Sequence, residues 1–380
     1  MTPTERAIAS LPPHLRRFAV AQDHAAYTPR DHAVWRFVLR RLTAHLAGRA
    51  HPRYLAGLAA VGIGVEAIPS LDEMNEKLAG AGWSAVGVRG FLPPAVFTEL
   101  QSRRVLAIAA DVRTHEHVEY TPAPDIVHES AGHAPLVADP TYAEYLRRCG
   151  EAGFRAIASL EDQAVFEAVR NLSIAKEDPA APPAERRLAE ERLAAAGASV
   201  REDSEAARAS RLYWWTAEYG LVGPLAAPRI YGAGLLSSIG EAVHCLGPKV
   251  ERVPLTAACA GEPYDITRMQ PRLFVARDFE QLRWFGELSA FASGEGEARA
   301  RARKAAALPP ALGALYAEVR RMRERGAVER DRLLAIRDAA ARFTDDWLLR
   351  NEVDELLSQG PPARGPEPEP GPPASRGTEP

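Results

Sequence analysis

The chain has 380 residues, which at about 150 residues per domain corresponds to two or three domains, or to one large one. Hydrophobic residues make up 46% of the sequence and charged residues 26%, which excludes fibrous and collagen-like classes and indicates a chain that buries a core. The formal net charge of -3 provides no overall basic field, so neither nucleic acid nor a membrane surface is an expected partner.

The cysteines and the N-terminus point to one compartment. Cys149, Cys245 and Cys259 form no CxxC pair and are odd in number, which argues against a disulfide framework. The first residues lack the apolar stretch of a signal peptide, and no run of about 18 apolar residues occurs. We therefore expect a cytoplasmic protein.

The first elements in chain order are helical. Apolar residues at helical spacing predict one helix over 35–46 and a second from Tyr54 to Val61. Ser70, followed three residues later by Glu73, has the pattern of a capping box and predicts a helix that ends near Leu78.

Strand-like runs are few and short. They cover Ala85–Val88, Val105–Val112 and Arg272–Val275, with no strand–helix rhythm that would predict a doubly wound sheet. We therefore predict a mainly α fold with a few short strands.

Three regions stand apart from the rest of the sequence. Residues 155–211 are charged and alanine-rich, with a proline break at 180–186, and we expect a helical excursion with solvated faces. Apolar spacing over 308–357 predicts two amphipathic helices interrupted at Gly326, which either pack on their own domain or pair with a second subunit. The proline-rich residues 360–380 are expected to be a disordered tail.

The densest group of reactive residues lies in TPAPDIVHESAGHAPL, residues 121–136. His128 and His133 stand five apart, unlike the four-residue spacing of HExxH zinc sites. Five residues turn an α-helix by about 500°, so the two imidazoles diverge unless the helix ends or distorts between them. Gly132 and Pro135 offer such an end, which would let both imidazoles reach one metal. The alternative is a pair of satisfied core histidines.

Glu218 is the candidate third ligand. It is the only acid in the aromatic run RLYWWTAEYGL, residues 211–221, where burying a lone carboxylate is costly without a cation or a hydrogen-bond partner. Two histidines and one carboxylate on one face of an octahedron suit non-haem Fe(II). The alternative is a carboxylate on the helix surface.

Three motifs, in order, resemble one family. TPAPDIVHESAGHAPL, then YWWTAEYGL, then YGAGLLSSIGE at 231–241 look like the signature of the pterin-dependent aromatic amino acid hydroxylases, and most like the phenylalanine 4-hydroxylase branch of bacterial type. The resemblance implies the helical basket of that family's catalytic domain. It also implies Fe(II), tetrahydrobiopterin or another tetrahydropterin, and O₂ as co-substrate, in phenylalanine catabolism.

The resemblance implies roles for individual residues. His128, His133 and Glu218 match the iron ligands. The pterin contacts it implies are Phe97, Leu92 and Glu129. The substrate contacts it implies are Arg113, Thr121, Trp214, Ser237 and Ile266. The residues that it implies take part in catalysis are Glu129, Ser237 and Tyr213.

Chemistry agrees with several of these roles. The planar fork of Arg113 suits the substrate carboxylate, and Ser237 suits a partner for an iron-bound imidazole. Trp214 argues against the larger indole of tryptophan as substrate. Ile266 stands where tyrosine-specific members carry an acid, so an apolar wall favours phenylalanine, although such a wall rejects an added hydroxyl only weakly.

The resemblance implies a division of the chain. Residues 1–80 are a helical segment packed on the catalytic domain, 81–300 are the iron and pterin domain with 155–211 as a helical insertion, and 301–359 are C-terminal helices, through which a homo-oligomer could form. The sequence departs from the family at HESAGH, where leucines are usual, and at Ala107, where better-known members have a histidine near the pterin.

Other functions stay open at this point. Tyrosine, tryptophan or the meta position of phenylalanine are alternative targets of hydroxylation. A zinc hydrolase on the same ligands would use Glu129 as base and would not need Arg113. A non-catalytic protein that binds an amino acid or a pterin would not need Glu218.

Overall fold

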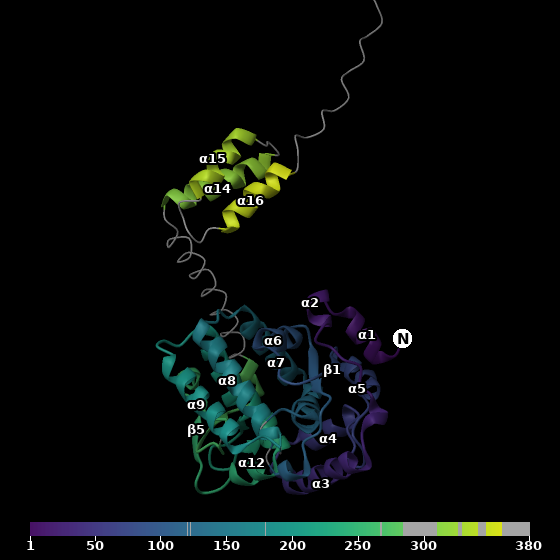
Figure 1. Ribbon diagram of the computed structural model, residues 1–380. Helices are drawn as coiled ribbons and strands as arrows, with labels where there is room; N and C mark the ends of the chain where they lie inside the picture. The colour runs from purple at the N-terminus through teal and green to yellow at the C-terminus, as the bar shows by residue number, and fades with distance from the viewer. Residues whose placement is uncertain are drawn as a thin grey trace, which may run out of the picture. The chain divides into compact units, whose positions relative to one another are not determined.

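The computed structural model describes residues 1–119, 121, 123–178, 180–266, 268–283, 310–325, 329–340 and 347–358. The chain divides into two compact units, Met1–Ala298 and Arg299–Pro380 (Figure 1). The tail predicted at 360–380 and the break predicted at Gly326 lie outside the described residues.

The N-terminal part of unit 1 is a series of helices. They are α1 (Pro3–Ser10), α2 (Pro13–Arg16), η1 (His24–Ala26), α3 (Pro29–Leu46), α4 (Arg53–Ala60), α5 (Leu71–Leu78) and η2 (Ala79–Ala81). The apolar face predicted over 35–46 is the buried face of α3, where Trp35 and Leu46 are fully buried. The helix predictions in this part of the chain are confirmed.

The capping box predicted for α5 is wrong. Ser70 is the N-cap residue, but its side chain makes no capping hydrogen bond. The side-chain oxygen of Gln22 instead accepts from the Leu71 amide at 2.8 Å. An acceptor from a distant segment therefore satisfies a free amide of the first turn, which the local pattern assigned to Ser70.

Two small sheets hold the strands. β1 (Ser84–Val88) pairs in parallel with β2 (Val105–Ala109), and α6 (Pro94–Ser102) connects them. The second sheet has the order β4-β3-β6-β5, built from β3 (Leu221–Val222), β4 (Arg229–Ile230), β5 (Glu251–Pro254) and β6 (Arg272–Ala276). The three predicted strands are present, although β2 ends earlier than expected. β3, β4 and β5 were missed because they are short.

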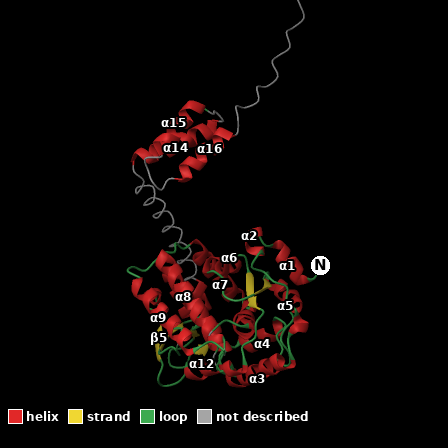
Figure 2. Ribbon diagram, viewed as in Figure 1, coloured by secondary structure: helices red, strands yellow, loops and turns green. Residues whose placement is uncertain are grey.

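The middle of unit 1 contains the segments that carry the predicted site. They are η3 (His115–His117), η4 (Val127–His133), η5 (Ala134–Ala138), α7 (Pro140–Arg155), α10 (Glu205–Tyr213), η6 (Trp214–Glu218), α11 (Ala233–Ser237), α12 (Ile239–His244) and η7 (Ala257–Gly261). One large hydrophobic core joins α3 and α4 to η4, α7, η6 and α11. A mainly helical fold with few strands is confirmed (Figure 2).

The charged excursion is a helical hairpin, formed by α8 (Leu160–Glu177) and α9 (Pro183–Ser199). The predicted proline break separates its two helices, which have a small core of their own around Leu172, Ala175 and Ala189. Figure 1 shows this hairpin in teal at the side of unit 1.

Unit 2 contains three described helices, where the sequence predicted two. They are α14 (Pro310–Arg325), α15 (Arg330–Ala340) and α16 (Trp347–Ser358). Leu312, Val319, Leu333, Ile336 and Val353 belong to one apolar cluster, so the three helices pack against one another. The second helix was predicted from apolar residues between Leu333 and Trp347, which covers most of α15 and reaches the first residue of α16. Among the described helices, none has the length and apolar character needed to cross a membrane.

Candidate metal centre

Both segments that carry the candidate ligands are π-helical. His128 and His133 lie on the π-helix η4, and Glu218 ends the π-helix η6. A π-helix closes hydrogen bonds five residues apart, so residues at that spacing lie nearer to one face than in an α-helix. The two imidazoles were expected to meet only if the helix ended or distorted between them. The segment is in fact a distorted, π-helical one, and η5 follows it directly.

Glycine permits the close packing around η4. A β-carbon at Gly132 would lie 2.8 Å from the carbonyl oxygen of Ala233, at the start of α11. A β-carbon at Gly232 would meet the carbonyl oxygen of Glu218. The two glycines bring α11 against both ligand-bearing segments, so the three predicted ligands converge through backbone contact.

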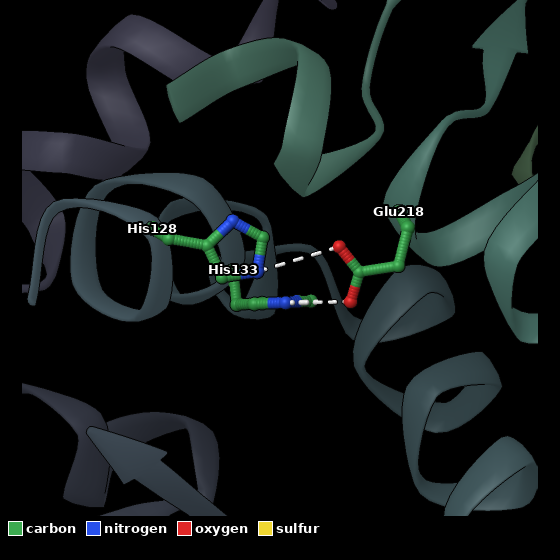
Figure 3. A group of neighbouring side chains, drawn as sticks. All are labelled: His128, His133 and Glu218. Atoms are coloured by element: carbon green, nitrogen blue, oxygen red, sulfur yellow. Dashed lines mark ion pairs between the residues drawn. The ribbon is translucent and has the colours of Figure 1, made fainter. Parts of the chain in front are cut away.

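The three candidate ligands face one another (Figure 3). A ligand atom from each of His128, His133 and Glu218 lies within 4.8 Å of the others. The Nε2 atoms of His128 and His133 lie 3.4 and 3.1 Å from the two Glu218 oxygens. Both ring nitrogens of His133 are buried without a hydrogen-bond partner among the described residues. This donor set, with an orphaned buried imidazole, fits a transition-metal ion.

Burial and mutual attraction set the charges of this group. Burial lowers the pKa of His128 to about 4 and so keeps its imidazole neutral, as a metal ligand must be. Burial alone would lower the pKa of His133, but the Glu218 carboxylate outweighs it and raises that pKa. Burial alone would raise the pKa of Glu218, but the two imidazoles hold it below its usual value. Glu218 is thus an anion that attracts a cation.

Ser237 orients one imidazole. Its hydroxyl lies 3.0 Å from Nδ1 of His128 and 2.7 Å from the carbonyl oxygen of Ala233, to which it donates. A hydroxyl that donates to Ala233 can accept from Nδ1–H, which leaves Nε2 of His128 free to bind a metal. Ser237 is therefore a hydrogen-bond partner of the imidazole of candidate ligand His128.

Arg113 is buried and already paired. Its Nε and Nη2 donate to the two oxygens of Asp125 at 2.9 and 2.7 Å, and Nη1 donates to the Ser237 carbonyl at 3.0 Å. Of the five guanidinium N–H groups, one on Nη1 and one on Nη2 remain. These two N–H groups can still donate to a carboxylate, although Asp125 occupies the side of the fork formed by Nε and Nη2.

Tyr213 connects the metal ligands to the predicted pterin contacts. Its ring stacks on His133 with centroids 6.3 Å apart and meets Phe97 edge to face at 5.9 Å. Gln101 donates to its hydroxyl at 2.6 Å. Phe97 and Leu92 are both half-buried beside the core next to β1 and β2. The Phe97 side chain is therefore not fully enclosed by the protein.

Trp214 is the centre of an aromatic stack. Its indole lies between Tyr219, at a centroid distance of 4.5 Å, and Tyr264, at 4.2 Å. Tyr264 belongs to the loop that also carries the half-buried Ile266. The structure thus brings the loop of the predicted substrate residue Ile266 next to Trp214.

The last two predicted residues occupy different settings. The Thr121 hydroxyl contacts the Ala123 carbonyl at 2.9 Å and donates to the Glu177 carboxylate at 3.0 Å. Glu129 follows the first ligand on η4, and burial raises its pKa to about 8. Both residues lie in the segment 121–133 that carries the metal ligands.

Sequence reasoning missed Asp125, Gln101, Tyr264 and Glu177. Asp125 lies inside the quoted motif, three residues before His128, and its side chain accepts from the His128 amide at 3.0 Å. An acid three residues before a helical histidine is a capping signal that could have revealed it. The other three contact the site from distant elements and leave no local signal.

The chain matches the family model described as "Biopterin-dependent aromatic amino acid hydroxylase" over residues 17–165 and 188–293. It is similar to the phenylalanine-4-hydroxylase of Ralstonia nicotianae, with 32% identity over 274 residues that cover 70% of this chain and 72% of the relative.

Solved structures from Chromobacterium violaceum are also similar. Its phenylalanine hydroxylase with bound oxidised Fe(III) has a TM-score of 0.58 and 28% identity, with 75% of this chain and 88% of that chain covered. The form with iron(III) and 7,8-dihydrobiopterin has a TM-score of 0.58 and 27% identity, with 76% and 90% covered. With the metal-ligand cluster above, these matches establish that the chain belongs to the biopterin-dependent aromatic amino acid hydroxylases.

Proposed function

We propose that this protein is an Fe(II)- and tetrahydropterin-dependent monooxygenase that converts L-phenylalanine to L-tyrosine with O₂. The observation that carries the proposal is the convergence of His128, His133 and Glu218, with the orphaned nitrogens of His133, in a chain of this family. In this proposal the three side chains hold iron. Iron together with a reduced pterin supplies the activation of O₂ that ring hydroxylation requires.

The amino acid end of the substrate has a matching donor. The free N–H groups on Nη1 and Nη2 of Arg113 receive its carboxylate, while Asp125 fixes the guanidinium from the other side. Since the Arg113 side chain is only 1% exposed, its pairing with Asp125 fixes its orientation before substrate arrives. Ser237 ties this arginine to the His128 imidazole, because its carbonyl accepts from Arg113 and its hydroxyl contacts the imidazole.

The aromatic ends of substrate and pterin have apolar surroundings. At the position of Ile266 the substrate ring meets an apolar side chain rather than an acid that would favour a phenolic ring, which supports phenylalanine over tyrosine. The acid of this loop, Asp265, pairs with Arg268 at 3.1 Å. Phe97, Leu92 and Tyr213 provide the surface on which the pterin ring rests, with Glu129 beside the first ligand. Trp215, 2% exposed, helps to keep water out of the site.

The test is a competition for labelled oxygen. Protein loaded anaerobically with Fe(II) receives tetrahydropterin, ¹⁸O₂ and equal amounts of phenylalanine, tyrosine and tryptophan, and the products are identified by mass spectrometry. We expect ¹⁸O in para-tyrosine, with loss of product in Glu218→Ala. A meta product would overturn the ring position, and oxygen on another amino acid would overturn the substrate. Zinc-dependent, oxygen-independent turnover would favour the hydrolase alternative.

The oligomeric state of this protein and its cellular compartment stay predictions. Oligomers formed through the C-terminal helices would appear in light scattering of the full chain and would disappear on removal of residues 301–380. A cytoplasmic location would be seen by cell fractionation.

A further inference from the structure

The hairpin α8–α9 lies where the family match is interrupted. The family match passes over residues 166–187, which include the second half of α8 and the start of α9. The hairpin supports itself, because Arg186 donates across the turn to the carbonyls of Ala175 at 3.2 Å and Asp178 at 2.9 Å. Its small apolar core adds to this. The end of α8 is therefore held in place by the hairpin's own contacts.

One polar contact joins that end of α8 to the candidate site. Glu177, the last residue of α8, accepts a hydrogen bond from the Thr121 hydroxyl at 3.0 Å. The Glu177 side chain is half-buried. The family segment that contains Thr121 thus meets a carboxylate from a segment that the family model lacks.

The chain around Thr121 is fastened to the site on both sides. Before it, the Glu119 carbonyl accepts from the Ser238 hydroxyl at 2.9 Å and from the Gly240 amide at 3.2 Å. After it, Asp125 holds the Arg113 guanidinium and the His128 amide. Thr121 therefore lies between two anchored points of the chain, and Glu177 contacts the same segment that carries Asp125, the partner of Arg113.

The Glu177 carboxylate has no countercharge among the residues that the structure describes. Among the described residues, no lysine, arginine or histidine nitrogen lies within 4.0 Å of it, and its hydroxyl partner Thr121 is shared with Ala123. On the same helix, Lys176 turns to Glu190 on α9, at 3.6 Å. A half-buried carboxylate with a single neutral donor favours a cation beside it. A free amino acid carries an ammonium group one carbon away from the carboxylate that Arg113 would hold.

We propose that Glu177 accepts a hydrogen bond from the α-ammonium group of the amino acid substrate, so that the hairpin supplies a specificity-determining residue. This inference rests on the proposed function for the identity of the substrate. Arg113 and Glu177 together recognise the two charges of a zwitterion, and Glu177 distinguishes an amino acid from an arylpropanoic acid of the same shape.

The test compares two ligands that differ in the ammonium group. Calorimetry on anaerobic, iron-loaded protein measures the Kd of phenylalanine and of 3-phenylpropanoate, with an inhibition constant used where binding is too weak. Glu177→Gln keeps an oxygen that can accept from Thr121 and removes only the charge. We expect the Kd of phenylalanine to rise about tenfold, the effect of losing one charged hydrogen bond, and that of 3-phenylpropanoate to stay within about twofold.

Controls separate this role from a structural one. Glu167→Gln removes an exposed carboxylate from the same helix and should change neither Kd. The KM for phenylalanine should rise in Glu177→Gln while kcat is kept, with unchanged iron content and thermal stability. An equal loss for both ligands would mean that Glu177 only supports the loop of Thr121, and no loss for either would also overturn the inference. Wild-type protein that binds phenylalanine but does not hydroxylate it would refute the proposed function alone.

Discussion

The metal-site core and the α8–α9 hairpin are both helical but are built differently. In the core, η4, η6 and α11 approach so closely that Gly132 and Gly232 leave no room for a β-carbon. In the hairpin, a β-carbon at Gly197 would meet nothing within 4 Å, and Leu160 is 88% exposed. The core holds its side chains through close long-range contacts, whereas the hairpin is a local structure with a small apolar core of its own.

Paired glycine substitutions should give the largest difference between the two regions. Gly132→Ala places a methyl group 2.8 Å from the Ala233 carbonyl, and we expect a loss of about 3 kcal/mol in unfolding free energy together with loss of iron binding. Gly197→Ala fills open space within α9 and should stabilise its helix by about 1 kcal/mol. Urea unfolding and iron titration measure both. Equal effects at the two positions would contradict the comparison.

Acid–base behaviour in the core should make stability depend on pH. Glu241 on α12 is 1% exposed, and burial raises its pKa to about 7. The unfolded chain ionises this carboxyl near pH 4.5, but the folded protein keeps it protonated until about pH 7. The contribution of Glu241 to the free energy of unfolding is therefore fully present below pH 4.5. It is lost as the pH rises to 7, which lowers the free energy of unfolding by about 3 kcal/mol.

The matched variant is Glu241→Gln, which cannot ionise. Chemical unfolding between pH 5 and 8 should show a flatter stability profile for the variant than for the wild type. A profile that keeps the full wild-type slope would assign the pH dependence to other groups. Glu167→Gln on the exposed side of the hairpin should leave the profile unchanged.

Removing the hydroxyl beside candidate ligand His128 should have a smaller effect on stability and a specific effect on iron binding. Ser237→Ala removes the hydroxyl that lies 3.0 Å from Nδ1 of His128, and we expect iron affinity to fall by about ten- to a hundredfold. Global stability should change less, because the small side chain leaves little space behind. Competition with a chelator measures the affinity. Unchanged iron affinity in a folded variant would show that Ser237 does not orient the imidazole.

Loosening the hairpin should have the smallest global effect. Leu172→Ala removes the largest buried side chain from the small core of the hairpin, which also contains Ala175 and Ala189. We expect faster amide exchange over α8 and α9 while the iron site and the main unfolding transition stay the same. Phenylalanine binding should weaken as it does in Glu177→Gln, since the position of Glu177 depends on the hairpin. A lower main transition temperature would show that the hairpin belongs to the core.

The sequence by itself determined much of the local structure and the choice of the candidate ligands. Apolar periodicity predicted helices of unit 1, and the proline break predicted where the hairpin turns. Both features depend on residues that are close together in the chain. Glu218 stood out because burying a lone acid among aromatic residues is costly without a cation or a hydrogen-bond partner. His128 and His133 stood out because Gly132 and Pro135 offer an end to the helix that would let both imidazoles reach one metal.

Only the tertiary structure decided how these residues meet. The segments η4 and η6 adopt a π-helical form close to α11, Asp125 pairs with the side of the Arg113 fork formed by Nε and Nη2, and Gln22 replaces Ser70 at the start of α5. Glu177 reaches Thr121 across 56 positions of sequence. Such contacts join residues that no local pattern connects, because their energies depend on burial and distance rather than on spacing along the chain.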